Sequence, residues 1–286
     1  MVQTWGSSRL QLGEGVRWVG DRVVLVDIVE GLLLEAQTST GPLQVLAKLD
    51  VPLGAVAPVV GRPHSWIAAA GTGVGLLDED GGLRWIDRPE DRTPLRTRMN
   101  DAVADPLGRF WAGSMAWDKT EGAGRLYRVD CDGTVSAVLD GLTIPNGPAF
   151  SSDGTVMYLA DTPRRTIYRL AVDPGDGALS EQEVFAEITD PVGNPDGMTV
   201  DDDGLLWVAL WGAGLIRRFA ADGSVDRDVP LPVAQPASVC LDGAGTMWVA
   251  TARIELDDPQ PTDGALLRTP VEINAPAAAA YIPTWL

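Results

Sequence analysis

The amino-acid sequence predicts an all-β fold, a six-bladed β-propeller with four-stranded blades that uses residues 1–286 as one domain. Three observations predict it. The chain has 32 Gly and 21 Pro in 286 residues, which indicates many turns and short elements. A short apolar run recurs six times at blade length, and a hairpin-like segment follows each copy. Helical stripes with a period of 3.6 residues are absent from the sequence.

The apolar run is the strand on which the repeat is aligned. Its central residues, here called the anchors, are Val24, Trp66, Trp111, Tyr158, Trp207 and Trp248. The spacings between successive anchors are 42, 45, 47, 49 and 41 residues. Propeller blades of four strands repeat every 40 to 50 residues or so. Because six copies fill the chain without a long linker, we expect six blades in a single domain.

A second element completes each blade. Its clearest copies are 124–130, 166–170 and 214–219, and Asp-Gly follows the first and third of them at 132–133 and 222–223. Alternating segments joined by Asp-Gly are typical of β-hairpins. Each blade is therefore expected to have an inner pair of strands followed by an outer hairpin. Segment 4–10 precedes the first inner strand, and we expect it to pair within the last blade.

Composition excludes several classes of function. With 40 acidic and 22 basic residues, the net charge of −18 would repel a nucleic acid. His64 is the single histidine, which excludes multi-histidine zinc sites, and no Gly-x-Ser-x-Gly elbow supports a catalytic triad. Cys131 and Cys240 are too few for a disulfide framework and are expected to be buried in strands.

The sequence shows no secretion signal and no apolar run of membrane-spanning length. We expect a cytoplasmic protein without membrane partners that is a monomer or a weak homo-oligomer.

Four polar residues share one phase of the repeat. Glu14, Asn100, Asn146 and Asp196 precede their anchors by 10, 11, 12 and 11 residues. In a propeller, the loops that enter the innermost strands open at one mouth of the central channel, so these side chains should meet there. Asn-Gly and Asp-Gly are also ordinary turn sequences, but the shared phase favours a common site.

Carboxylate and amide oxygens suit Ca²⁺ or Mg²⁺ best, and Mn²⁺ or Zn²⁺ can use them too. Trp211 is a candidate for the wall of this site.

The sequence resembles the regucalcin family, also called the senescence marker protein/gluconolactonase family, over nearly the whole chain. The resemblance is carried by Gly13-Glu14-Gly15-x-x-Trp18, Arg98-Met99-Asn100-Asp101, Ile144-Pro145-Asn146-Gly147 and Pro195-Asp196-Gly197-Met198. Two residues depart from the family pattern: Val16 stands where proline is usual, and Pro148 where leucine is usual. Neither departure removes a candidate ligand, but both bear on the shape of the channel mouth.

The resemblance implies a six-bladed propeller that binds one divalent metal ion and hydrolyses lactones. By motif, Glu14, Asn146 and Asp196 correspond to metal ligands, which leaves Asn100, together with Arg98, as a substrate contact. A substrate-binding acid of the family corresponds to Glu121 or to Asp118.

The predicted activity is the hydrolysis of a small lactone, above all a sugar lactone, with Asp196 as the general base and Ca²⁺ as the first choice of metal. Two alternatives stay open at this point. One is a metal-dependent esterase or phosphotriesterase that uses the same centre. The other is a propeller that binds calcium without catalysis, since a fold does not fix a function.

Overall fold

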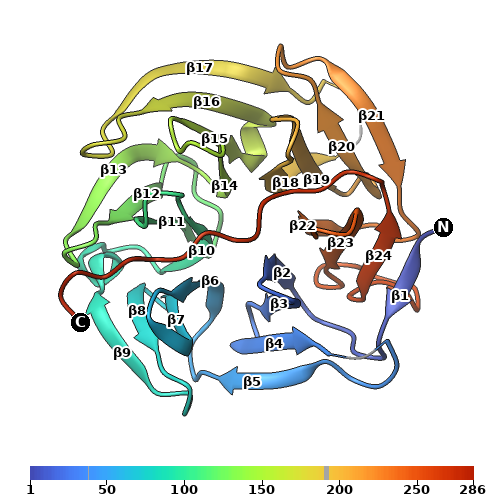
Figure 1. Ribbon diagram of the computed structural model, residues 1–286, viewed down its shortest axis with the longest axis horizontal. Helices are drawn as coiled ribbons and strands as arrows, with labels where there is room; N and C mark the ends of the chain where they lie inside the picture. The colour runs from blue at the N-terminus through green and yellow to red at the C-terminus, as the bar shows by residue number, and fades with distance from the viewer. Residues whose placement is uncertain (38, 190–192) are drawn as a thin grey trace.

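The computed structural model describes residues 1–37, 39–189 and 193–286, and in these residues 24 strands form six four-stranded antiparallel sheets. The sheets stand around a central channel (Figure 1). The predicted six-bladed propeller is confirmed. Each of the first five blades is continuous in sequence, with its first strand at the channel and its fourth strand outside.

Blades 1 to 3 occupy the N-terminal half of the chain. Blade 1 consists of β2 (Gly13–Val19), β3 (Arg22–Asp27), β4 (Leu32–Ala36) and β5 (Gln44–Lys48). Blade 2 consists of β6 (Leu53–Val59), β7 (Arg62–Ala70), β8 (Gly73–Leu77) and β9 (Leu83–Asp87). Blade 3 consists of β10 (Thr97–Ala104), β11 (Phe110–Ala116), β12 (Gly124–Val129) and β13 (Val135–Leu142), and the 3-10 helix η1 (Pro89–Arg92) precedes it.

Blades 4 to 6 complete the ring. Blade 4 consists of β14 (Pro145–Phe150), β15 (Val156–Asp161), β16 (Thr166–Val172) and β17 (Leu179–Glu187), with the 3-10 helix η2 (Thr162–Arg164) between β15 and β16. Blade 5 consists of β18 (Asn194–Val200), β19 (Leu206–Trp211), β20 (Leu215–Phe219) and β21 (Val225–Pro230). Blade 6 consists of β22 (Pro236–Leu241), β23 (Thr246–Thr251), β24 (Leu266–Pro270) and β1 (Gln3–Trp5).

The two ends of the chain meet in blade 6. Strand β1 pairs antiparallel with β24, from Gln3 opposite Arg268 to Trp5 opposite Leu266. The pairing is shorter than the expected segment 4–10, because the chain leaves the sheet after Trp5 and the Leu10 N–H donates to the Gly264 carbonyl at 2.7 Å. A strand from the start of the chain thus covers the outer edge of the last sheet, which protects its unpaired backbone groups.

The anchor tryptophans stabilise the turn that connects the two inner strands. Trp111, Trp207 and Trp248 donate from Nε1 to the carboxylates six residues earlier, Asp105, Asp201 and Asp242, at 2.9, 2.7 and 3.0 Å. The other oxygen of each carboxylate accepts backbone N–H groups of the turn. Each buried Asp is thereby satisfied, and the repeated indole places the second strand of its blade.

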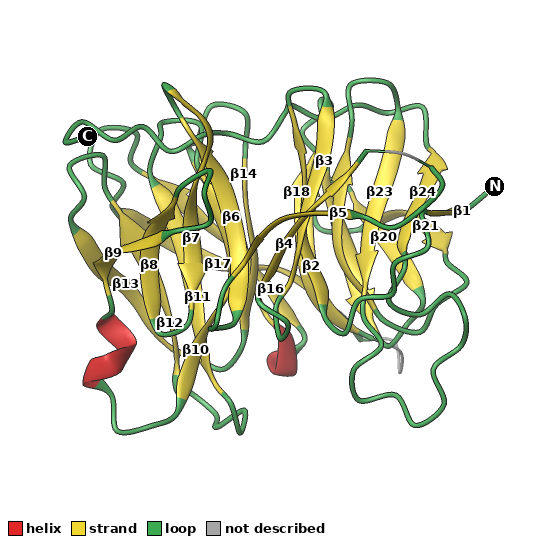
Figure 2. Ribbon diagram, turned by 90° about the horizontal axis from the view of Figure 1, so that it is seen from below, coloured by secondary structure: helices red, strands yellow, loops and turns green. Residues whose placement is uncertain are grey.

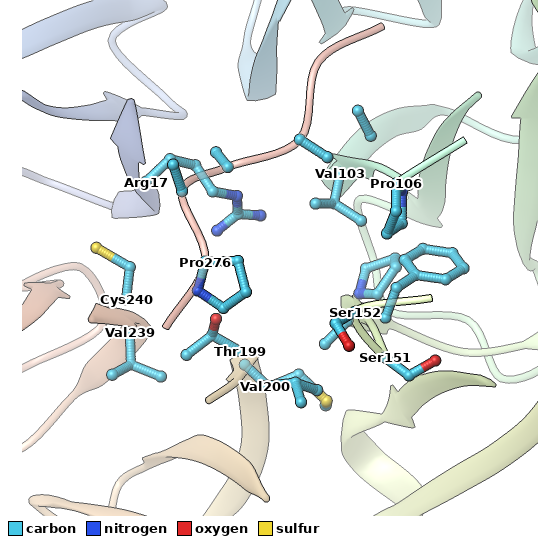
Figure 3. A pocket seen from close by; sticks show the side chains of 18 of the residues that line it. Arg17, Val103, Pro106, Ser151, Ser152, Thr199, Val200, Val239, Cys240 and Pro276 are labelled. Atoms are coloured by element: carbon cyan, nitrogen blue, oxygen red, sulfur yellow. The ribbon is translucent and has the colours of Figure 1, made fainter. Parts of the chain in front are cut away.

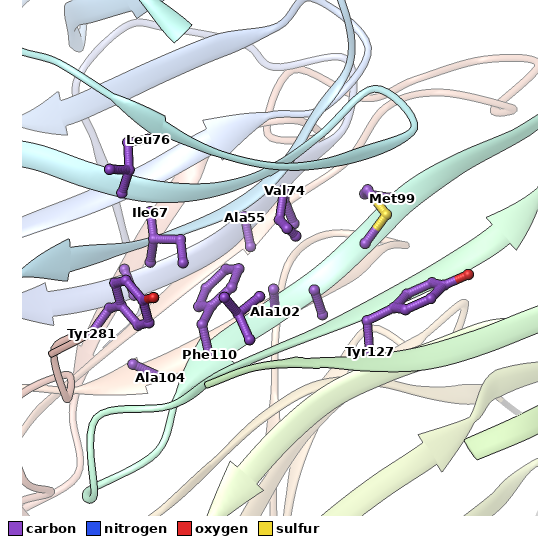
Figure 4. Close-up of a cluster of buried hydrophobic side chains, with 14 of the residues drawn as sticks. Ala55, Ile67, Val74, Leu76, Met99, Ala102, Ala104, Phe110, Tyr127 and Tyr281 are labelled. Atoms are coloured by element: carbon purple, nitrogen blue, oxygen red, sulfur yellow. The ribbon is translucent and has the colours of Figure 1, made fainter. Parts of the chain in front are cut away.

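Apolar side chains fill the space between neighbouring blades. Between blades 2 and 3, residues such as Ile67, Met99 and Phe110 are almost fully buried (Figure 4).

Cys240 is buried in β22, as predicted, but the prediction for Cys131 was wrong: it is partly exposed in the β12–β13 turn. That turn lies outside the strands, and the C-terminal segment covers it only in part: the Thr284 N–H donates to the Cys131 carbonyl at 2.7 Å.

The C-terminal segment 271–286 crosses the channel mouth opposite to the face with the 3-10 helices (Figures 1 and 2). Its backbone bonds to several blades: Ala278 N–H donates to the Trp18 carbonyl at 2.8 Å, and Tyr281 N–H to the Pro58 carbonyl at 2.8 Å. Tyr281 is fully buried against the cluster between blades 2 and 3. The repeat pattern gives no sign of this segment, because it lies outside the blades.

In the part of the chain that the structure describes, no helix has the length and apolar character needed to cross a bilayer.

Candidate functional site

The four polar residues that share a repeat phase lie on four innermost strands. Glu14 is on β2, Asn100 on β10, Asn146 on β14 and Asp196 on β18, and each is at most 5% exposed. The prediction placed these residues in the loops that enter the strands, whereas they stand within the strands. The antiparallel register shifts at each of these positions, which marks a β-bulge. Bulges re-aim side chains, and here they face one channel cavity.

Glycine allows the close approach of the strands at this height. Gly147 has a φ of +51°, and a Cβ there would lie 2.9 Å from the Asp196 carbonyl oxygen. A side chain at this position would therefore strain the backbone and push blades 4 and 5 apart. The Asn-Gly sequence positions the amide and at the same time keeps the channel narrow.

The cavity has a volume of about 270 Å³, and Thr162 and Pro163 of η2 are among the residues that line it. Its polar floor is made by Glu14, Arg98, Asn100, Asn146 and Asp196. Its walls are largely apolar and include Leu12, Val29, Met115, Trp117, Ile144, Trp211 and Ile254. The candidate Trp211 is therefore a wall residue. A polar floor under apolar walls is typical of small-molecule sites.

One chain of hydrogen bonds fixes both amides. The Arg98 guanidinium donates to Asn100 Oδ1 at 2.7 Å, so the Asn100 Nδ2 group faces Asn146 and donates to its Oδ1 at 2.6 Å. Asn146 Nδ2 in turn donates to Thr162 Oγ1 at 2.9 Å, and that hydroxyl donates to the Pro195 carbonyl at 2.7 Å. Because Asn146 Nδ2 is held by Thr162, its Oδ1 is directed toward the floor of the cavity. That oxygen has a second lone pair for another ligand.

The two carboxylates of the floor are buried together. Burial, followed by repulsion from Asp101, raises the pKa of Glu14 to about 8, although the Gly15 N–H, Arg17 and Arg98 oppose the rise. Burial, followed by the charge of Glu14, also raises the pKa of Asp196 well above its usual range. Two acids with raised pKa values in one cavity indicate a functional site.

Arg98 is the guanidinium that faces these acids. Burial lowers its pKa to about 10, while Glu14 and Asp196 oppose that shift, so Arg98 stays charged at neutral pH. Its guanidinium carbon lies 5.6 Å from the ring centroid of Trp117, which covers part of the cavity wall. The arginine is therefore held from two sides with its charge toward the floor.

The residues of the floor fit a hard divalent cation. Asp196 Oδ1 is buried and has no hydrogen-bond partner among the described residues, which leaves it free to bind a cation. No three His, Cys, Asp or Glu side chains in the described residues are grouped to hold a metal by themselves, so the set here needs an amide oxygen. Two carboxylates and one amide suit Ca²⁺ or Mg²⁺.

The loop between β11 and β12 differs from its prediction. Glu121 and Asp118 are exposed, and neither lines the cavity; the Asp118 carboxylate accepts the Thr120 N–H at 3.0 Å. Trp117 and Lys119 from the same loop line it instead. Substrate binding by Glu121 or Asp118 thus stays a prediction that the geometry does not favour.

The rim of the cavity carries an ion pair that the sequence did not reveal. Lys119 Nζ lies 3.1 Å from each carboxylate oxygen of Glu255, on a loop of blade 6. Both residues have a positive φ, 59° and 62°. Partners 136 residues apart leave no local signal in the sequence.

Comparisons with known proteins find similarity over most of the chain. A family model described as the SMP-30/Gluconolactonase/LRE-like region matches residues 12–253. Pentonolactonase XacC of Haloferax volcanii is 39% identical over 220 residues, which are 75% of this chain and 72% of that protein. L-arabinolactonase of Azospirillum brasilense is 34% identical over 226 residues, 76% of this chain and 72% of that protein.

A solved structure extends the likeness to the whole fold. The calcium-binding protein regucalcin from Agrobacterium tumefaciens matches with a TM-score of 0.89 at 28% identity, over 96% of this chain and 95% of that one. The family resemblance drawn from the sequence motifs is confirmed. With its matched region spanning all four bulged strands of the site, the chain belongs to the SMP-30/gluconolactonase/LRE-like family.

Proposed function

We propose that this protein is a hydrolase that opens a small sugar lactone with the help of one divalent cation. The observation that carries the proposal is the floor of the cavity, where Glu14, Asn146 and the unpartnered Oδ1 of Asp196 meet beside Arg98. The names of the two lactonases similar to this chain support the choice of substrate class.

Glu14, Asn146 and Asp196 would hold the cation, with Ca²⁺ as the first candidate and Mg²⁺, Mn²⁺ and Zn²⁺ as others. When bound, such a cation polarises a carbonyl oxygen and lowers the pKa of water beside it. The raised pKa values of Glu14 and Asp196 fit this role, because a cation compensates the charge that burial disfavours.

The side chains of the protein supply the remaining chemistry. Asp196 accepts the proton of the attacking water, whose oxygen bonds to the lactone carbonyl carbon. Arg98 donates to the substrate oxygen on which negative charge develops, a contribution of about 3 kcal/mol for a well-placed donor. The ring C–O bond then breaks, and the leaving oxygen takes up the proton that Asp196 accepted, which gives the open hydroxy acid and restores the Asp196 carboxylate. Asn100 accepts from Arg98 and donates to Asn146 and to the Pro145 carbonyl, so it holds the Arg98 and Asn146 side chains in place beside the substrate.

The apolar walls determine what fits above this floor. Trp117 and Trp211 offer flat surfaces to the carbon face of a sugar ring, while the rim pair of Lys119 and Glu255 offers polar groups to its hydroxyls. A volume of about 270 Å³ accommodates a pentono- or hexonolactone and water.

The test is a pH-drop assay of purified protein on a panel of pentono- and hexonolactones, after chelation and after add-back of each cation. We expect turnover that chelator abolishes and Ca²⁺ restores. Asp196→Asn should lower kcat/KM by at least 10³-fold, whereas Asp202→Asn, an exposed neighbour in the same blade, should not change it.

Aryl esters and phosphotriesters belong in the same panel. Faster turnover of either class would replace the lactone proposal by an esterase or phosphotriesterase that uses the same floor. Cation binding without turnover of any ester would make the chain a calcium-binding propeller.

A further inference from the structure

Beneath the floor lies a buried ion pair that joins two blades which are not neighbours. Arg17 Nη2 of β2 lies 3.1 Å from Asp101 Oδ1 of β10, and the side chains are 10% and 2% exposed. Arg17 follows Glu14 by three residues, and Asp101 follows Asn100 directly. The pair therefore sits one layer below the residues that face the cavity.

Asp101 makes further bonds with both of its oxygens. Its Oδ2 accepts the Gly147 N–H at 3.0 Å, and its Oδ1 accepts the Ala102 N–H at 2.8 Å. Gly147 comes directly after Asn146, a candidate ligand. A single carboxylate thus contacts β2, β10 and β14, three of the four innermost strands that build the floor.

Arg17 holds this carboxylate in place. Its guanidinium also donates to the Val16 carbonyl at 3.0 Å and to the Ala102 carbonyl at 3.0 Å. The planar guanidinium suits three acceptors on two strands, which an ammonium group could not reach together. Blade 2 lies between the two strands and meets them with Gly54 and Ala55, and the backbones pack so closely that a Cβ on Gly54 would collide with the Asn100 carbonyl oxygen.

The same pair separates the two ends of the channel. Arg17 lines a second cavity, of about 210 Å³, which lies at the opposite mouth between the innermost strands and residues 276–279 of the C-terminal segment (Figure 3). Asp101 is not among the residues that line this second cavity. The ion pair therefore lies between the residues of the floor and this second cavity.

We propose that Asp101 is a positioning residue for the cation site: anchored by Arg17, it fixes β14 behind Asn146 and β2 behind Glu14, and so presents their oxygens ready for binding. The inference rests on the cation site of the proposed function but not on lactone hydrolysis. Groups behind metal ligands act in this way, and their loss typically lowers metal affinity 10- to 100-fold.

The test separates position from charge. The double variant Arg17→Gln/Asp101→Asn removes one positive and one negative charge, so the net charge of the site is unchanged. Its control is Arg22→Gln/Glu35→Gln, which removes a partly buried pair with a 2.9 Å contact between β3 and β4 of blade 1. Ca²⁺ affinity is measured by calorimetry and by the Ca²⁺-induced rise of Tm.

We expect the Arg17/Asp101 double variant to bind Ca²⁺ about 10- to 100-fold more weakly, and the control to stay within about twofold of wild type. Asp101→Asn alone should bind still more weakly, because it leaves the Arg17 cation unpaired near the site. Adding Arg17→Gln should therefore restore part of the affinity, which a purely structural role would not predict.

Should the double variant fail to fold, Arg17→Lys keeps the charge but loses the simultaneous bonds, and we expect it to lower Ca²⁺ affinity on the order of 5-fold against Arg22→Lys. Affinity within twofold of wild type in the folded Arg17 variants would overturn the inference and leave lactone hydrolysis standing. Absence of Ca²⁺ or any divalent binding by wild type would overturn the cation site itself.

Discussion

Glu14→Gln tests the electrostatics of the floor in the cation-free protein. The pKa of Glu14 is raised from 4.5 to about 8, mainly by burial. Between these values the folded state keeps a proton that the unfolded state has released. Stability must then fall as pH rises, from about pH 4.5 until the folded carboxyl ionises near pH 8. Above that pH the penalty is constant.

The expected magnitude follows from the same pKa. Each pH unit in this window costs about 1.4 kcal/mol, and the slope flattens near the folded pKa, so the loss between pH 6 and pH 8 is about 2 kcal/mol. For a chain of this size that lowers Tm by roughly 4 °C. Glutamine cannot ionise, so Glu14→Gln removes this slope. It also relieves the like-charge repulsion that helps to raise the pKa of Asp196.

The assay is thermal unfolding in chelator at pH 6, 7 and 8 for wild type, Glu14→Gln and Glu187→Gln, an exposed control that loses the same formal charge. The difference in Tm between Glu14→Gln and wild type should widen in favour of the variant as pH rises. Excess Ca²⁺ should reverse the trend in wild type only, because its binding requires ionised carboxylates. Parallel curves for all three proteins in chelator would refute the reasoning.

Three further outcomes are expected. Thr162→Val removes the hydroxyl that orients the ligand amide, so Ca²⁺ affinity measured by calorimetry should fall about 10-fold, while the exposed Thr134→Val should leave it unchanged. Tyr281→Phe loses the bond from its hydroxyl to the Asp130 carbonyl, at 2.9 Å, and the bond that Trp285 Nε1 donates to that hydroxyl, at 3.2 Å, and should cost about 1 to 2 kcal/mol in urea unfolding, against about 3 to 5 kcal/mol for Tyr281→Ala; equal losses would show that the ring packing contributes nothing. Burial raises the pKa of the Cys240 thiol to about 12, so this thiol should resist a thiol reagent at pH 8 until urea unfolds the chain, and rapid labelling of the native protein would contradict its burial.

Local repetition explains how much of the fold was predictable. Each of the first five blades makes its own strand pairs within about 45 residues, so the repeated tryptophans such as Trp111 and Trp207 show the pattern in the sequence. The convergence of Glu14, Asn146 and Asp196 followed from the same phase, because symmetry brings equivalent positions to one channel. The β-bulges that turn these side chains inward could not be seen, since a bulge is defined by its partner strand.

Other parts of the site had no signal in the repeat. Lys119 and Glu255 come from loops of unequal length, and such loops do not follow the blade period. The loop that contains Glu121 shows the consequence: the motif indicated an acid near the substrate, but the turn directs Trp117 and Lys119 into the cavity instead. Side-chain direction in a loop depends on its whole backbone path.

The sequence by itself determined the number of blades, the four polar positions at the channel and the family. Only the tertiary structure decided how these groups are held: the pairing of Arg17 with Asp101 across 84 residues, the orientation of the Asn146 amide by Thr162, and the path of the C-terminal segment over the opposite mouth. The physical reason is the sequence separation of the residues that interact. Strand periodicity and turns are local properties of the chain, whereas contacts between blades depend on how the completed sheets pack around the axis.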